Sequence, residues 1–176
     1  IFLCSALGFV CAFSGYACPC GYFTDPKKAC HCTPPEIQRY LSKISGPLLD
    51  RIDIHIEVPR LKYEDLSRKR SGEESALIRE RVNRARATQM KRYEKEDLLF
   101  NAHLESKNLE EYCKLTKGAG ELLKMAILEI GISARAYDKI LKVSRTIADL
   151  DGREMIEEHH ISEAIGYRSL DRNLWT

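Results

Sequence analysis

The 176-residue sequence lacks the motif G-x-x-x-x-G-K-[ST], the glycine-rich loop whose backbone N–H groups surround nucleotide phosphates. It also lacks an apolar run that ends in paired acidic residues, which would supply a magnesium site beside such a loop. We therefore expect that this chain alone neither binds ATP tightly nor hydrolyses it.

Long hydrophobic runs are also missing. The apolar segment Ile1 to Ala17 is shorter than the roughly 20 residues that a membrane span needs. A signal peptide is one interpretation of it, because its length and its small final residues would suit a cleavage site, but no basic residues precede it. The first residue is isoleucine rather than methionine, as in a fragment or a processed chain.

The composition is that of a soluble globular protein, with 31% charged and 44% hydrophobic residues. The length suggests one large domain or two small ones. The formal net charge of +2 identifies no partner by itself. We expect a cytoplasmic location and no membrane partner.

Four cysteines, Cys18, Cys20, Cys30 and Cys32, form the pattern C-x-C-x9-C-x-C with turn-forming residues between the pairs. Four thiolates around a tetrahedral Zn²⁺ are the usual structural use of such clustering. The alternatives are four reduced loop thiols, or disulfides if the chain were secreted. The other three cysteines, including Cys113, are interpreted as ordinary small apolar residues.

A strict alternation marks the end of the segment SGPLLDRIDIHIEVP, residues 45–59. Apolar β-branched side chains alternate there with polar ones, which predicts a half-buried strand over residues 52–58, ended by Pro59. Arg51 precedes this strand, at its edge. An arginine in that position either contacts a phosphate or is only a solvated charge.

The rest of the chain predicts helices, because apolar residues recur at helical spacing. Thr33 and Glu36 form a capping box at the start of the first helix. Gly131 and Gly152 end two of the others. The helices are expected over residues 33–45, 73–94, 109–113, 122–130, 132–152 and 160–167.

A basic segment runs from Ser67 to Lys95, where ten Lys or Arg face four Glu, a local excess of +6. Such a charge run is usually a solvated helix face. The sharper interpretation is contact with a nucleic-acid phosphate backbone, which would be salt-dependent and independent of base sequence.

Arg135 is unusual because it lies in the first turn of the predicted helix 132–152, where a cation opposes the helix dipole. The free N–H groups of that turn favour an anion. Arg135 therefore fits a bound phosphate, and a nearby carboxylate is the structural alternative. For Arg145, further along the helix, we expect an ion pair.

Two of these stretches carry a family resemblance. SGPLLDRIDIHIEVP, and SARAY (133–137) followed by KVSRTIADL (142–150), resemble the Mg-chelatase-like AAA+ proteins of the YifB or ComM type. The resemblance extends from Cys18 to the C-terminal end. It implies that Arg51 is the arginine finger, supplied to ATP in a neighbouring subunit, and that Arg135 is the sensor 2 residue that contacts nucleotide phosphates. Where the family carries Asn-Pro, with sensor 1, this chain has Tyr16-Ala17.

The resemblance implies a mainly α fold, the end of an AAA+ α/β core followed by a C-terminal helical lid domain. Residues 1–60 would be the core remnant, with Ile1–Ala17 as a buried central strand, 61–107 the linker and basic helix, and 108–176 the lid. The full-length protein would use ATP and Mg²⁺ and form a homo-oligomeric ring, with DNA as a further partner because ComM-type members act on it. The alternative from another class is a non-enzymatic, zinc-stabilised DNA-binding module.

Overall fold

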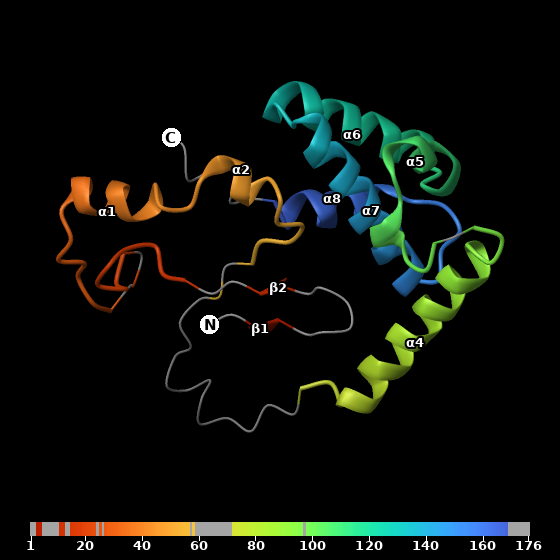
Figure 1. Ribbon diagram of the computed structural model, residues 1–176, viewed down its shortest axis with the longest axis horizontal. Coiled ribbons are helices and arrows are strands. Elements are labelled where there is room, and N and C mark those ends of the chain that lie inside the picture. The colour runs from red at the N-terminus through yellow and green to blue at the C-terminus, as the bar shows by residue number, and fades with distance from the viewer. Residues whose placement is uncertain are drawn as a thin grey trace. The chain divides into compact units, whose positions relative to one another are not determined.

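The computed structural model describes residues 3–4, 11–12, 15–23, 25, 27–56, 58, 72–96 and 98–168. They belong to two compact units, Ile1–Leu49 and Asp50–Thr176, each of which is described by itself. The protein is mainly helical, as the sequence predicted (Figure 1). No helix in this described part is long and apolar enough to cross a membrane.

In the first unit, the described residues form two short strands and two helices. Strand β1 (Leu3–Cys4) pairs antiparallel with β2 (Cys11–Ala12), so the apolar segment forms a strand pair where a single central strand was expected. Helix α1 spans Pro34–Leu41, and the short α2 spans Gly46–Leu49.

The start of α1 matches the sequence prediction. The Thr33 N–H and hydroxyl donate to a carboxylate oxygen of Glu36 at 2.8 and 2.9 Å, which satisfies one of the free donors at the helix start. Of the residues on the expected inward face, Ile37, Tyr40 and Leu41 are half-buried but none is fully buried, and Ile44 is exposed beyond the end of α1.

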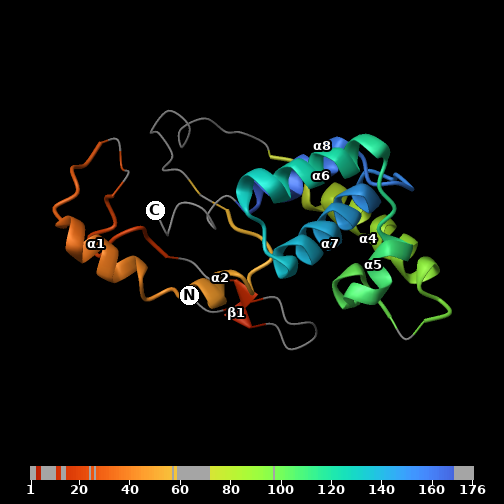
Figure 2. The ribbon, with the colours of Figure 1, turned by 90° about the horizontal axis from the view of Figure 1, so that it is seen from above.

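The second unit is a helical bundle. Its described part contains α4 (Ser75–Arg92), the 3₁₀ helix η1 (Asn101–His103), α5 (Ser106–Tyr112), α6 (Lys117–Ile130), α7 (Ala134–Leu150) and α8 (Glu158–Gly166). Helix α7 packs against α4, α5, η1 and α8, and α6 packs against α8 (Figures 1 and 2). The core of the bundle therefore lies around α7.

The inward face of α7 is the one that the apolar spacing predicts. Ile140, Leu141, Ser144 and Ala148 are buried, and Tyr137 and Ile147 pack partly buried against the same core. A helix whose apolar positions recur every three or four residues buries one stripe, and tertiary packing of that stripe supplies most of its stability.

Local signals fix the ends of α6 and α7. The Ser133 hydroxyl accepts a hydrogen bond from the Ala136 N–H at 3.1 Å, which caps α7. Gly131 and Gly152 adopt left-handed conformations, with φ of 70° and 72°, as predicted for helix-terminating glycines. The start of α6 differs from the prediction: Thr116 caps it, and the helix therefore begins five residues before Leu122.

A buried polar network joins α4, η1 and α7. The Asp149 carboxylate accepts hydrogen bonds from both terminal nitrogens of Arg92, at 2.9 and 2.5 Å, and from Asn101 Nδ2 at 2.8 Å. Arg145 Nη2 lies 3.0 Å from the same carboxylate. The expected ion pair of Arg145 is confirmed.

Arg145 also closes the C-terminal end of α7. Its terminal nitrogens donate to the carbonyl oxygens of Glu154 and Arg153 at 2.5 and 2.6 Å, although the side chain is only 1% exposed. Buried charges persist where they are paired and hydrogen-bonded. This arginine therefore has a structural role.

The predicted strand over residues 52–58 is wrong for the part that the structure describes, residues 52–56 and 58. The polar His55 is buried, whereas Ile56 and Val58 are 67% and 84% exposed. The backbone of this segment bonds to the end of α8: the His55 N–H donates to the carbonyl oxygen of Tyr167, the C-cap residue, at 2.7 Å. An alternating pattern forms a strand only where a partner strand takes up its backbone groups.

Candidate functional site

The segment Asp50–His55, here called the finger loop, lies along the N-terminal half of α7. The Asp50 carboxylate accepts a hydrogen bond from Arg135 Nη1 at 2.9 Å and one from the Ser133 hydroxyl at 3.3 Å. Arg168 Nη2 lies 3.9 Å from the same carboxylate. The residue next to Arg51 in the chain thus contacts Arg135.

The backbone of the finger loop is held from two sides. Lys139 Nζ donates to the Arg51 carbonyl oxygen at 2.5 Å and lies 2.8 Å from Asp53 Oδ1. Arg168 Nη1, after the end of α8, donates to the Ile52 carbonyl oxygen at 2.9 Å. Consecutive carbonyl groups of the loop are therefore bound by one cation of α7 and one that follows α8.

These contacts explain the unfavourable charges at the start of α7. Arg135 and Lys139 are one helical turn apart near the end of the helix that repels cations. Asp50 and Asp53 of the finger loop pair with them, one with each. The structural alternative considered for Arg135, a nearby carboxylate, is thus present, while its phosphate contact stays a prediction.

The four clustered cysteines of the first unit converge. Cys18 Sγ lies 3.4 Å from Cys20 Sγ and 3.7 Å from Cys30 Sγ, and all four sulfurs lie within 4.8 Å of one another. Four sulfurs bound tetrahedrally to zinc at about 2.3 Å would be about 3.8 Å apart. The donor set therefore fits a zinc ion, and its sulfurs are too far apart for disulfides.

Backbone N–H groups of the cysteine loop favour negative charge on some of these sulfurs. Backbone N–H groups of Tyr22 and His31 lower the pKa of Cys20 to about 6. For Cys32, an N–H bond from Cys20 favours the thiolate, but burial and the neighbouring thiols outweigh it and raise the pKa to about 12. One thiolate thus forms readily, and a bound cation would be needed to neutralise more.

Cys113 behaves as predicted for a small apolar residue. It is buried in the helical core, and this burial raises the pKa of its thiol to about 11. It is not a reactive thiol at neutral pH.

A second cluster, Asp151, His159 and His160, also has ligand atoms within 4.8 Å of one another. His160 Nδ1 accepts the Glu157 N–H at 2.9 Å, so its other nitrogen, Nε2, carries the hydrogen. That nitrogen lies 3.5 Å from Asp151 Oδ2, and the imidazole holds the pKa of Asp151 below its ordinary value. A protonated Nε2 has no lone pair for a metal. The His160 side chain instead caps the start of α8.

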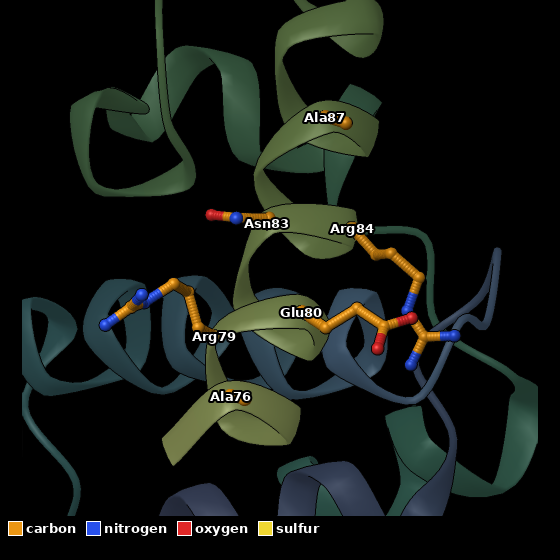
Figure 3. A pocket seen from close by; sticks show the side chains of 6 residues that line it. All are labelled: Ala76, Arg79, Glu80, Asn83, Arg84 and Ala87. Atoms are coloured by element: carbon orange, nitrogen blue, oxygen red, sulfur yellow. The ribbon is translucent and has the colours of Figure 1, made fainter.

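The outer face of α4 is opposite the face that packs on α7. A shallow hollow there is lined by Ala76, Arg79, Glu80, Asn83, Arg84 and Ala87. In Figure 3, Arg79 and Asn83 point to one side of the helix and Glu80 and Arg84 to the other. Among the described residues, neither Arg79 nor Arg84 forms an ion pair.

Part of the basic charge of the Ser67–Lys95 segment is neutralised within the chain. Arg81 donates hydrogen bonds to both carboxylate oxygens of Glu73, at 2.8 and 3.0 Å, and Arg92 forms an ion pair with Asp149. Residues 68–70 lie outside the described part of the chain. The described helix therefore offers fewer free cations than its composition suggests.

Three residues of this region were not singled out from the sequence: Asp50 as the partner of Arg135, Lys139 and Arg168. A signal for the first two exists. Cations at positions 135 and 139 lie on one face of a helix, at the end where cations are disfavoured. Asp50 and Asp53 are also close together in sequence, in the finger loop. No signal in the sequence marked Arg168.

Comparison with known sequences identifies the class of protein. Residues 72–168 match the family described as "Magnesium chelatase, subunit ChlI C-terminal", and residues 5–66 match "Magnesium chelatase, subunit ChlI". The chain therefore belongs to the Mg-chelatase-like AAA+ family, and its bundle is the C-terminal helical domain of that family. The match begins at residue 5, before the Cys18 from which the resemblance was expected.

Individual relatives narrow the class to the YifB and ComM type. The chain is 45% identical over 157 residues to the Competence protein ComM of Haemophilus influenzae, a match that covers 89% of this chain and 30% of ComM. It is 41% identical over 144 residues to the uncharacterized protein YifB of Escherichia coli, which covers 81% of the chain and 28% of YifB. The chain thus spans about 30% of the length of these relatives.

Proposed function

We propose that this chain contributes two arginines to ATP hydrolysis in an oligomeric ring formed by the full-length protein. Arg51 is the arginine finger, acting on ATP held by a neighbouring subunit, and Arg135 is sensor 2. Their guanidinium groups stabilise the negative charge that spreads over a transferring phosphoryl group. ATP and Mg²⁺ are bound by residues outside this chain, since it contains neither the glycine-rich phosphate loop nor the apolar run that ends in paired acidic residues.

One observation carries this proposal: the finger loop places Arg51 beside the helix that bears Arg135. Asp50, its neighbour, pairs with Arg135, and the Arg51 carbonyl bonds to Lys139 one turn further along. The side chains of Arg51 and Arg135 are both exposed. Two exposed cations on adjoining elements suit a polyanion such as a triphosphate.

Subunit mixing tests this function. Full-length Arg51→Ala protein should lose ATP hydrolysis by ~10³-fold or more, because an arginine finger typically contributes that much. Mixing it with a variant whose phosphate-binding loop is inactivated should restore part of the activity. An interface at which an Arg51→Ala subunit supplies the loop and a loop-inactivated subunit supplies Arg51 is then intact, whereas the opposite order lacks both groups. An absence of rescue at every mixing ratio contradicts a finger that acts between subunits.

We further propose that Cys18, Cys20, Cys30 and Cys32 bind a structural Zn²⁺. The converging sulfurs support it, as does the Phe23 N–H that donates to Cys18 Sγ at 3.3 Å. A structural zinc would tie the two cysteine pairs together across a polar turn, in which Asp25 Oδ1 accepts the N–H groups of Lys27 and Lys28.

Elemental analysis of protein purified without added metal tests the zinc site. We expect about one zinc per chain, lost in the Cys20→Ser and Cys30→Ser variants and kept in Cys113→Ser. A zinc content near zero in the unsubstituted protein contradicts the proposal.

A DNA contact by the outer face of α4 is the second candidate function. Arg79 and Arg84, together with Asn83, offer hydrogen-bond donors on a face that packs against nothing in the described structure. Glu80 lies between them, and a relative of this chain is named a competence protein. Contacts of this kind would bind the phosphate backbone and weaken with salt.

Retention on immobilised duplex DNA at low salt tests this contact. Arg79→Glu with Arg84→Glu should abolish retention, whereas Lys117→Glu with Lys124→Glu, the same change in charge on α6, should leave most of it. Equal loss in both pairs would indicate a general effect of net charge and no site on α4.

A further inference from the structure

We propose that Lys139 is a positioning residue that sets the pose of Arg51 by binding its backbone carbonyl. This inference rests on the proposed role of Arg51 as an arginine finger. It assigns to a residue of the helical domain a role that is exerted through Arg51, and it couples the position of Arg51 to α7.

The geometry leaves Lys139 little freedom. Its side chain is 14% exposed, and Nζ lies 2.5 Å from the Arg51 carbonyl oxygen and 2.8 Å from Asp53 Oδ1. These two acceptors lie on either side of Ile52 in the loop. A single ammonium group, which has three donors, thus fixes the loop both before and after that residue.

The other contacts of the finger loop do not replace this one. Asp50 meets Arg135 and Ser133 through its side chain, ahead of Arg51 in the chain, and Arg168 binds the next carbonyl, that of Ile52. Lys139 bonds to the main chain of Arg51 itself. The peptide plane that leaves Arg51 is therefore oriented by α7.

Such an orientation matters because an arginine finger acts through a long side chain. A small rotation of the peptide plane at its base moves the guanidinium far enough to lose contact with a phosphoryl group. Misplacement of a catalytic group by about 1 Å can cost roughly 10²-fold in rate. Held by Lys139, the finger loop would move together with α7, so a movement of the helical domain would carry Arg51 with it.

Substitution of Lys139 in the full-length protein tests the inference. Lys139→Met keeps the length and the apolar stem of the side chain but loses the donor, so the kcat of ATP hydrolysis should fall by ~10- to 100-fold with little change in KM. Lys139→Arg, which retains donors, should recover most of this loss. Lys142→Met on the same helix is the matched control, because Lys142 Nζ lies near Ala102 O instead of the finger loop.

Mixing separates positioning from a merely structural role. Lys139→Met subunits should be rescued by the variant with the inactivated phosphate loop, as Arg51→Ala subunits are, because only their finger is impaired. A different outcome is that mixing rescues Arg51→Ala while Lys139→Met is either fully active or inactive without rescue. This result would contradict the positioning role of Lys139 and leave the role of Arg51 as arginine finger intact. If Arg51→Ala itself retains activity or is never rescued, the proposed function fails first.

Discussion

At the scale of single residues, the stability of the bundle depends on buried charges that neutralise one another. Asp149 has no exposed side-chain surface and is bound by Arg92 and Arg145 together, while Asn101 fills its remaining acceptor position. Burial lowers the pKa of the Arg145 guanidinium, and the charge of Asp149 opposes that shift. Each of these charges is tolerated only because the others are present.

We therefore predict that Asp149→Ala lowers the free energy of unfolding by about 3–5 kcal/mol, since two arginines would lose the carboxylate that compensates them. Urea unfolding followed by circular dichroism measures this. Glu129→Ala, an exposed acidic position on α6, should change stability by less than about 0.5 kcal/mol. A loss below about 1 kcal/mol for Asp149→Ala would show that the network contributes little.

At the scale of elements, helix α6 shows that the same residue type can serve opposite purposes. Gly120 lies within the helix and Gly131 ends it with φ of 70°. A Cβ atom added at either position would meet nothing within 4 Å. Both sites have room for a methyl side chain, so the effect of a substitution depends on the backbone conformation of each glycine.

We expect Gly120→Ala to raise the free energy of unfolding by about 0.5–1 kcal/mol, because alanine loses less backbone entropy in a helix. Gly131→Ala should lower it by about 1–2 kcal/mol, since an L-residue is strained in the left-handed region. Both are measured by urea unfolding of the same protein. Changes of the same sign in the two variants would contradict the assigned helix end.

At the scale of the whole chain, the two units differ in how they are held together. The second unit has an apolar core around α7, whereas the described part of the first buries few side chains and gathers four cysteines in one loop. The finger loop, Asp50–His55, belongs to the second unit. The predicted three-part division, with boundaries at residues 60 and 107, stays a prediction.

Deletion of residues 1–49 should therefore leave the bundle folded, with its free energy of unfolding changed by less than about 0.5 kcal/mol, as expected for independent units. Hydrogen exchange of the α7 amides and urea unfolding measure this. Loss of a cooperative transition in the shortened chain would show that the bundle needs the first unit.

The sequence alone determined the features that local chemistry controls. Apolar spacing placed α7 and its inward face, and Ser133, Gly131 and Gly152 defined helix ends, because capping and left-handed glycine depend on neighbouring residues only. The family resemblance selected Arg51 and Arg135 as the predicted finger and sensor 2 residues, and the cysteine spacing selected four candidate metal ligands.

Tertiary structure decided whatever depends on residues distant in sequence. The alternation over residues 52–58 predicted a strand, yet the Ile52 carbonyl and the His55 N–H bond to residues at the end of α8, which no local pattern records. The basic segment gave a large local charge, but Arg81 and Arg92 meet carboxylates of their own chain. Asp50 and Lys139 lie more than 80 residues apart, and only folding brings the finger loop and α7 together.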